Sequence, residues 1–173
     1  MIEVLHTSAI ENGYSFIETL LFASVGAKLG SLVTAKTNPI ISMQASLFTF
    51  ALVTIVGGLV LSGPDRKPFL YLFGPLWGLV IGWEFTAQNT FFALSLPKGQ
   101  EAEFSGFYSY CSVILSWLPP LIFSVVNEAG VRMQYALMTL AIFPITAASL
   151  QFLIAPWKDV RQQASTLSKN LVV

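Results

Sequence analysis

Long apolar segments, separated by short polar turns, are the dominant pattern along the chain. A membrane-spanning helix needs about 20 mainly apolar residues, because the hydrocarbon core is ~30 Å thick and each helical residue rises ~1.5 Å. Five segments meet this requirement: residues 14–36, 40–62, 68–96, 104–127 and 134–157. They lack the alternation of period two that marks outer-membrane β-strands. The pattern predicts an all-α, polytopic membrane helix bundle with five spans.

The connections between these segments are short and rich in turn-forming residues. Asn, Pro, Gly and Asp occur at 37–39, 62–65, 97–99 and 128–130, and such residues favour turns. Short loops place consecutive helices antiparallel. We therefore expect an N-terminal segment at 1–13, an up-and-down transmembrane bundle at 14–157 and a polar C-terminal tail at 158–173.

The composition agrees with a membrane location and excludes several other functions. The chain is 54% hydrophobic and only 10% charged, whereas a soluble domain carries about 25% charged residues. Because the formal net charge is zero, the chain lacks the basic field that nucleic-acid binding requires. A single Cys (Cys111) and a single His (His6) exclude an intrachain disulfide and a zinc site. We expect lipid surroundings, no nucleic-acid partner, no metal and no cofactor.

The basic residues near the span ends predict an orientation. Five of them fall on one side of the predicted bundle and three on the other: Lys36, Lys98, Lys158, Arg161 and Lys169 against Arg66, Lys67 and Arg132. Because cytoplasmic loops carry an excess of Lys and Arg, the C-terminus is expected in the cytoplasm. Five spans then place the N-terminus on the other side without a signal peptide, which suggests that an upstream part is missing.

Glu84 is the most informative single residue, because an ionised carboxylate inside a membrane costs about 2.5–3.5 kcal/mol on insertion scales. At 100° per residue, Trp77, Ile81 and Gln88 share its helix face. This face, together with the neighbouring Asn89, is a candidate substrate or proton pathway. The functional interpretation is a cavity-lining carboxylate that binds a proton or a cationic group. The alternative is a protonated, structural Glu that is hydrogen-bonded to another helix.

Glycines repeat at a spacing of four residues in two of the predicted spans. Gly74, Gly78 and Gly82 form one stripe, and Gly26 and Gly30 form another. Small residues at this spacing let two helix backbones approach closely. The stripes predict tight helix packing, which is also compatible with a helix contact that moves during transport.

Four prolines lie inside the predicted spans: Pro75, Pro119, Pro120 and Pro144. Each lacks a backbone N–H and frees the carbonyl four residues earlier, so helix kinks are expected. Interrupted helices often mark substrate sites in transporters. The adjacent pair Pro119 and Pro120 is the most distinctive of these signals.

The loop before the fourth segment carries a more specific signal. Glu101 and Glu103 precede that segment and suit the positive end of its helix dipole. The string at 97–108, Pro-Lys-Gly-Gln-Glu-Ala-Glu-Phe-Ser-Gly-Phe-Tyr, resembles the loop between the tenth and eleventh helices of the autophagy-related vacuole-effluxer family of the major facilitator superfamily. Its loop-motif residues here are Pro97, Gly99, Glu101, Glu103 and Gly106. The string Ser-Trp-Leu-Pro-Pro-Leu-Ile-Phe at 116–123 resembles the eleventh helix.

The resemblance implies a fold and a function. The five spans would correspond to helices eight to twelve of a twelve-helix transporter, whose N-terminal half is missing from this chain. The implied activity is efflux of amino acids from a vacuole or lysosome-like compartment by alternating access. The chain departs from the family's usual sequence in two places. Asn89-Thr90-Phe91 stands where many relatives carry Ser-Arg-Ser in the tenth helix. Residues 30–36 stand where the cytoplasmic loop between the eighth and ninth helices usually has an Asp-Arg-type pattern.

Two other classes of protein are alternatives to a transporter. A non-transporting membrane scaffold or subunit would use the glycine stripes for helix association alone. An intramembrane enzyme would need clustered nucleophiles, bases or metal ligands. Both Asp residues, Asp65 and Asp159, lie outside the predicted spans. We therefore expect a secondary transporter and no enzymatic activity.

Overall fold

The computed structural model describes residues 8–97, 99–154 and 156–170, and every regular element in these ranges is helical. In chain order the elements are α2 (Ala9–Lys36), α3 (Pro39–Val60), the 3₁₀ helix η1 (Pro64–Phe69), α4 (Leu70–Ser95), α5 (Glu101–Ile114), α6 (Leu118–Glu128), α7 (Met133–Thr139), α8 (Ile142–Gln151) and α9 (Trp157–Asn170).

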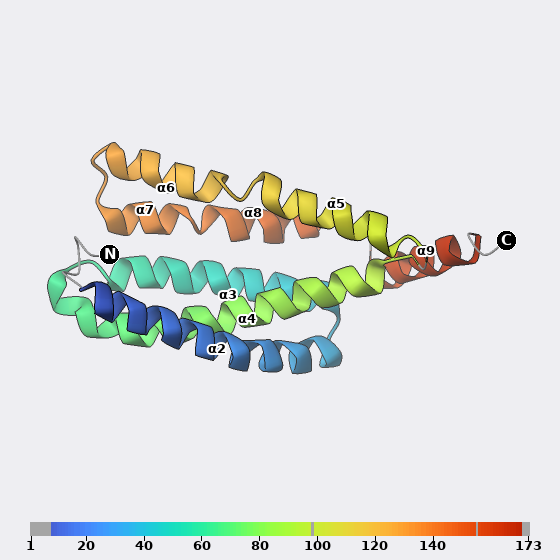
Figure 1. The fold of residues 1–173 in the computed structure, drawn as a ribbon, viewed down its shortest axis with the longest axis horizontal. Helices are drawn as coiled ribbons and strands as arrows, with labels where there is room; N and C mark the ends of the chain where they lie inside the picture. The colour runs from blue at the N-terminus through green and yellow to red at the C-terminus, as the bar shows by residue number, and fades with distance from the viewer. Residues whose placement is uncertain (1–7, 98, 155, 171–173) are drawn as a thin grey trace.

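The helices run up and down along one long axis (Figure 1). Helices α2, α3 and α4 form one group, in which α4 packs against both α2 and α3. The pairs α5–α6 and α7–α8 form a second group beside it, and α3 contacts both α7 and α8. Helix α9 extends beyond the end of the bundle. The contacts of α3 therefore join the two groups.

Local sequence signals explain where the first two helices begin. Ser8 and Glu11 form a reciprocal capping box: the Glu11 backbone N–H donates to Ser8 Oγ over 3.2 Å, and the Ser8 N–H donates to Glu11 Oε2 over 2.7 Å. Asn38 caps α3 by accepting the Ile41 N–H over 2.8 Å. Pro39 follows at the first helical position, where its missing N–H costs no intrahelical bond.

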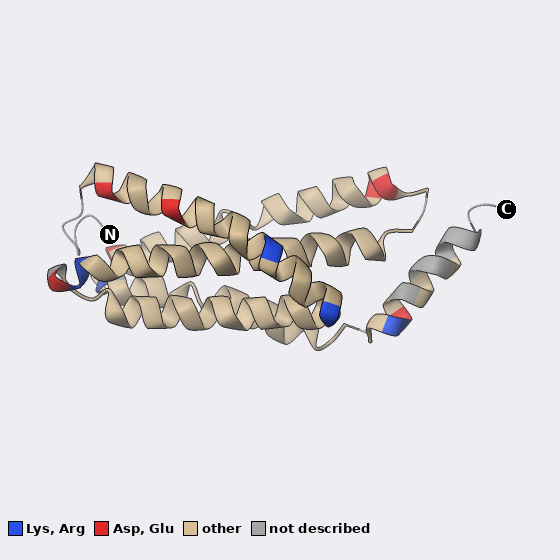
Figure 2. Ribbon diagram, turned by 90° about the horizontal axis from the view of Figure 1, so that it is seen from below, with Lys and Arg blue, Asp and Glu red and all other residues tan. Residues whose placement is uncertain are grey.

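The outside of the bundle is apolar. Large hydrophobic side chains such as Leu52, Phe107 and Leu153 are more than half exposed, a surface that suits lipid and not water. Charged positions gather toward the bundle ends and along α2 (Figure 2). Within the described residues, four stretches are long and apolar enough to cross a membrane: Ile10–Lys36, Pro39–Val60, Asp65–Ser95 and Glu101–Glu128. The predicted helical membrane bundle is confirmed as a fold class.

The fourth and fifth predicted spans are each divided into two helices. Segment 104–127 comprises parts of α5 and α6, and segment 134–157 contains α7 and α8. The fifth segment therefore lacks a single helix of spanning length, and the interruptions of the fourth and fifth spans lie beside Pro119 and Pro144, where the sequence predicts kinks. Proline provides the physical reason for both interruptions.

Both interruptions have the same hydrogen-bond pattern. Pro119 cannot donate to the Leu115 carbonyl, which instead accepts the Leu118 N–H over 3.1 Å. Pro144 cannot donate to the Leu140 carbonyl, which instead accepts the Phe143 N–H over 3.3 Å. In each case a tighter i→i−3 bond replaces the α-helical one. Pro75, by contrast, lies inside the continuous helix α4.

The glycine stripes form the contact between α2 and α4. A Cβ added at Gly78 would collide with the Thr19 carbonyl oxygen, and one added at Gly82 would collide with the Ala23 carbonyl oxygen. On the opposite helix, a Cβ at Gly30 would lie 2.7 Å from Trp83 Cα. The two backbones are thus in direct contact, and the predicted close packing is confirmed.

A buried hydrogen-bond network joins α2, α3 and α4 further along the bundle. The Ser42 side chain of α3 is fully buried. Its hydroxyl lies 2.7 Å from Thr34 Oγ1 of α2 and accepts the indole N–H of Trp83 from α4 over 2.9 Å. Each of the three helices therefore contributes one polar side chain to a single satisfied cluster.

The C-terminal tail contains a helix, α9, that the sequence does not predict. Helix α9 begins at Trp157, whose ring lies 5.9 Å from that of Phe91 on α4, measured between centroids. The interpretation of Lys158–Val173 as a polar tail therefore needs the addition of this helix. Residues 171–173 lie outside the described residues.

Candidate functional site: a cavity between α3, α4 and the α7–α8 interruption

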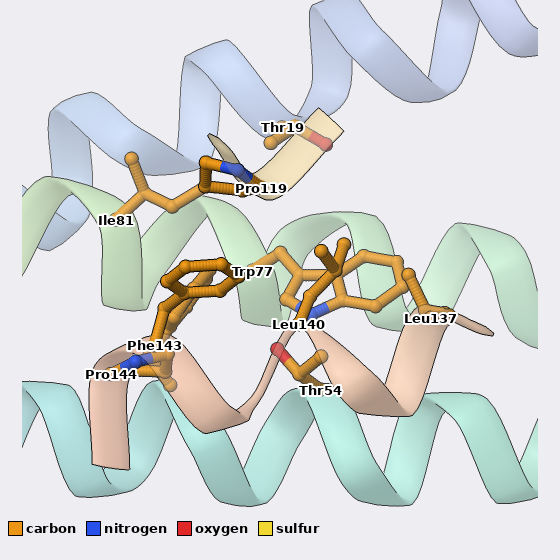
Figure 3. A pocket seen from close by; sticks show the side chains of 10 residues that line it. Thr19, Thr54, Trp77, Ile81, Pro119, Leu137, Leu140, Phe143 and Pro144 are labelled. Carbon is orange, nitrogen blue, oxygen red and sulfur yellow. The ribbon is translucent and has the colours of Figure 1, made fainter. Parts of the chain in front are cut away.

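A cavity of about 450 Å³ lies beside the point where α7 ends and α8 begins (Figure 3). Its walls come from α2, α3, α4, α6, α7, α8 and the short α7–α8 connection. The lining residues are Thr19, Phe50, Thr54, Trp77, Ile81, Pro119, Leu137, Leu140, Phe143 and Pro144. Its lining is almost wholly apolar, with aromatic rings on two sides and one proline from each interrupted helix pair.

A second cavity of about 290 Å³ adjoins the first and contains Glu84. The two cavities share four lining residues: Phe50, Ile81, Phe143 and Pro144. Leu47, Glu84 and Ala147 line only the second cavity. Because of the shared walls, the two cavities form adjoining compartments, which we call the Trp77 compartment and the Glu84 compartment.

Helical periodicity explains how the two compartments are arranged. On α4, Trp77, Ile81 and Glu84 recur at i, i+4 and i+7, which places them on one face. On α3, Leu47, Phe50 and Thr54 recur at i, i+3 and i+7. Seven residues rise about 10 Å along a helix. The compartments therefore follow one another along the bundle axis.

Small residues and proline make room for the Trp77 compartment. Trp77 packs against Gly57 of α3, where an added Cβ would lie 3.0 Å from the indole Cζ2. Phe73 supports the indole from its own helix, with a centroid separation of 5.8 Å. The tight turn at Leu140, caused by Pro144, interrupts the helix that faces the indole. The packed indole therefore forms one side of the compartment, and the irregular backbone at Leu140 forms the other side.

Thr54 is the unusual polar group of the Trp77 compartment. Its side chain is 5% exposed, and its hydroxyl has no hydrogen-bond partner within the described part of the chain. Thr19, the other hydroxyl-bearing residue in the lining, is satisfied because it donates to the Ser15 carbonyl over 2.8 Å. A buried polar atom without a partner costs about 1–3 kcal/mol. Thr54 therefore holds an unsatisfied, fully enclosed hydroxyl in the wall of this compartment.

Glu84 is partly buried near the middle of α4. Within the described residues, an ion pair joins Lys67 and Glu11 over 2.7 Å. It lies beside the N-terminal end of α4, whereas Glu84 lies near the middle of that helix. On α5, the Tyr108 ring stacks on Phe92 of α4, with 4.3 Å between the ring centroids. The Glu84 carboxyl group thus belongs to the lining of a mainly apolar compartment.

The structure brings together only part of the predicted site. Trp77 and Glu84 line the two compartments, and Pro119 contributes to the first. Gln88 and Asn89 line neither, and the Asn89 side chain donates to the Phe85 carbonyl of its own helix over 2.8 Å. The described residues contain no group of three His, Cys, Asp or Glu side chains able to hold a metal ion.

The loop-motif residues lie away from the cavity and shape the start of α5. Gly99 has φ +94° and donates its N–H to Glu101 Oε2 over 2.9 Å. Glu101 and Glu103 occupy the first turn of α5, as the helix-dipole argument predicts. Pro97 is buried, and Gly106 has nothing within 4 Å of an added Cβ. The adjacent Pro120 is exposed and lines neither compartment.

Sequence analysis missed several cavity residues. Thr54, Phe50 and Phe143 received no role, because they lie in uncharged apolar runs where similar residues are frequent. Pro144 was noted only as a kink. A signal was present nonetheless: a proline within a span predicts a local opening of the helix, and the neighbouring aromatic residue is then a candidate for lining it.

An all-helical bundle with an apolar exterior, two proline-interrupted helix pairs and an apolar cavity between its helices defines a polytopic membrane protein. The model of the vacuole effluxer Atg22-like family matches residues 2–164. The chain therefore belongs to this family, in agreement with the resemblance seen in the loop at 97–108. No curated protein and no solved structure matches the chain.

Proposed function

We propose that this chain forms part of a secondary transporter that exports small molecules, with amino acids as the substrate class, from a vacuole or lysosome-like compartment. The family match supports a transport role in a vacuolar membrane. The observation that carries the proposal is the pair of adjoining compartments between α3, α4 and α7–α8. Transporter sites commonly lie near the membrane midplane beside interrupted helices.

The chemistry of the compartments suits a small molecule that is both polar and apolar. The Glu84 compartment offers a carboxyl group to a proton or an ammonium group. The Trp77 compartment offers an apolar lining of Phe50, Phe143 and Leu140. An amino acid has both kinds of group, so the two compartments together accommodate its parts. A volume of about 450 Å³ falls within the usual range for ligand pockets.

Alternating access supplies the mechanism that we propose. Two helix bundles rock about a central site and expose it to one side of the membrane at a time. One wall of the site comes from α3, α4 and α7–α8. Ile81, a residue of both compartments, is 43% exposed, so this wall is open on one side. We propose that an N-terminal transporter half covers that opening.

A membrane scaffold remains the second candidate, because the glycine contact between α2 and α4 explains helix association without any transport. The two functions differ in whether the compartments must stay open. Replacing Ile81, which lines both compartments, with Trp should fill part of their volume. Leu52→Trp adds the same side chain at an exposed position of α3 that lines neither compartment.

The test is amino-acid efflux from native-membrane vesicles in which the complete transporter, with both halves, carries either variant. A transporter predicts that Ile81→Trp abolishes efflux while the amount of protein in the membrane matches that of Leu52→Trp, which stays active. Equal efflux from both variants, or no efflux above empty membranes from the wild type, would favour the scaffold.

A further inference from the structure

Lys28 places a charged side chain inside the membrane-spanning part of α2. Helix α2 lies at an edge of the bundle, as Figure 1 and Figure 2 show, and its Lys28 side chain is exposed. A Cβ added at Gly82, in the middle of α4, would lie 2.7 Å from the Ala27 backbone nitrogen. One added at Gly30 would lie 2.7 Å from Trp83 Cα. Because Ala27 and Gly30 flank Lys28, the lysine is level with the middle of α4, a helix long enough to cross a membrane.

The Lys28 side chain points away from the rest of the bundle. Gly26 and Gly30 contact α4, and Lys28 lies about 160° around α2 from each of them, at 100° per residue. None of the described residues forms an ion pair with Lys28. Glu84 lies at a similar depth on α4, but it lines its compartment with residues of α3 and α8. It is about 160° around α4 from Gly82, which contacts α2.

Lipid is a poor environment for this ammonium group. Charged side chains within a membrane span are costly and usually face a bundle interior or a water-filled cavity. Lysines near a helix end avoid the cost by extending to the interface. Lys28, however, lies eight residues before Lys36 at the end of α2, a distance of about 12 Å. Helical side chains also tilt toward the N-terminus, which for Lys28 is the direction away from that end.

The surrounding residues on this face of α2 are typical of a contact between membrane helices. Four exposed residues recur at i, i+4, i+7 and i+11, on one side of the helix: Ser24, Lys28, Ser31 and Ala35. Both serine hydroxyls donate to carbonyls of their own helix, so they leave no donor unpaired. Small and hydroxyl-bearing residues are enriched where membrane helices pack together. Exposed Leu21 and Leu32 flank the stripe.

We propose that the α2 face centred on Lys28 is an interface within the membrane, and that its partner is a transmembrane helix with a carboxylate at the depth of Lys28. This helix belongs to the N-terminal transporter half. Opposite charge is the complement that a desolvated ammonium group needs. Because α2 is in backbone contact with α4, the ion pair fixes where the wall formed by α4 lies relative to that half. The inference uses the N-terminal half invoked in the proposed function, but it does not depend on transport.

A second copy of this chain does not fit as the partner. Two-fold symmetry about the membrane normal places the same residues opposite each other, so Lys28 would face Lys28. Like charges repel, most strongly where water is absent. Glu18, the nearest acidic residue of α2, is ten residues away, which is about 15 Å along the helix. It therefore cannot reach Lys28 of a second copy at the same depth.

Lys28→Met in the complete transporter tests the interface, because the two environments predict opposite results. In an interface, the substitution leaves a buried carboxylate unpaired, and the melting temperature in detergent should fall by several degrees. In lipid, it removes a costly charge, and the melting temperature should stay the same or rise. Lys36→Met, exposed at the end of α2, is the matched control and should have no effect. An unchanged or raised melting temperature for Lys28→Met would overturn the proposal.

A photo-crosslink identifies the partner helix. A benzophenone side chain in place of Ser24 or Ser31 lies on the same face and leaves Lys28 intact. The expected product joins it to a peptide of the N-terminal half that contains Asp or Glu. Exchanging the charges, by Lys28→Glu together with Lys at that acidic position, should restore the melting temperature that either change alone lowers. Cross-links to lipid only, to a second copy of this chain or to a peptide without an acidic residue would overturn the proposal, as would an exchange without rescue.

Amino-acid efflux by the wild type separates this inference from the proposed function. Efflux by the wild type, together with an unchanged melting temperature in Lys28→Met, would keep the transporter and overturn the interface. The expected loss of stability and the expected cross-link, without any efflux by the wild type, would keep the interface and overturn the transport function.

Discussion

Trp83 of α4 donates its indole N–H to the buried hydroxyl of Ser42 on α3 over 2.9 Å. The same hydroxyl lies 2.7 Å from Thr34 Oγ1 of α2. Three helices thus meet at one satisfied polar cluster in an otherwise apolar bundle. Because an unpaired buried group costs about 1–3 kcal/mol, removing the central member should harm the fold more than removing the whole cluster.

The first prediction concerns this cluster. Ser42→Ala should destabilise the protein by about 1–3 kcal/mol, because it leaves two buried polar groups unpaired. The triple change Ser42→Ala, Thr34→Val and Trp83→Phe should cost less than the sum of the single changes. The destabilisation of each variant is measured by thermal unfolding in detergent, monitored as the loss of the folded peak in size-exclusion chromatography. Strict additivity would argue against a coupled cluster.

The second prediction concerns the glycine contact. Gly82→Ala should destabilise the bundle by about 1–3 kcal/mol, as over-packing does, because its Cβ would collide with the Ala23 carbonyl oxygen. Gly13→Ala is the matched control, since Gly13 lies on α2 with nothing within 4 Å of an added Cβ. The control should gain up to about 1 kcal/mol from helix propensity. Equal melting temperatures for the two variants would remove the packing argument.

The third prediction concerns Glu84. Glu84→Gln keeps the size of the side chain and removes its ability to release a proton, so expression should be unchanged while the pH dependence of efflux is lost. Glu84→Leu should also fold, because it removes a costly polar group from the membrane. Glu103→Gln, in the exposed first turn of α5, is the control and should keep the wild-type profile. A wild-type pH profile in Glu84→Gln would make Glu84 a structural acid.

The fourth prediction concerns orientation. Lys36 ends α2, and Lys158 lies in the first turn of α9. Arg66 lies in η1 and Arg132 precedes α7, at the other ends of these antiparallel helices. The excess of basic residues predicts that position 98 faces the cytoplasm and position 132 the opposite side. Single cysteines at 98 and 132 in a Cys111→Ser background should react with an impermeant thiol reagent from opposite sides. Labelling of both from one side would contradict the up-and-down arrangement.

The regular parts of the fold were predictable because their signals are local. Hydropathy and length predict long helices, the Asn38–Pro39 pair predicts the start of α3, and the four-residue glycine spacing predicts the α2–α4 contact. The interruption at Leu140 was less accessible, since Pro75 has the same chemistry and leaves α4 continuous. Whether a proline bends or divides a helix depends on the packing around it, which a single sequence does not contain.

The candidate site was predictable only where a residue type is rare in its surroundings. Glu84 is the one acidic residue of its apolar segment. The free-energy cost of an ionised carboxylate inside the membrane therefore marks it as a candidate site residue from sequence alone. Thr54 is chemically ordinary, and its importance comes from the absence of a partner, which requires coordinates. Gln88 was placed in the site by helical periodicity, but the compartments follow α4 only from Trp77 to Glu84.

The central claim is that a substrate occupies the compartments between α3, α4 and α7–α8. Its most direct test is the reactivity of Ile81→Cys, in a Cys111→Ser background, toward a small thiol reagent in native-membrane vesicles. Ile81 lines both compartments, and Leu52→Cys, exposed on α3 outside them, is the control. We predict that modification of Ile81→Cys blocks efflux and that transported amino acid slows this modification without affecting Leu52→Cys. Modification at the same rate with and without amino acid, leaving efflux intact, would contradict the claim.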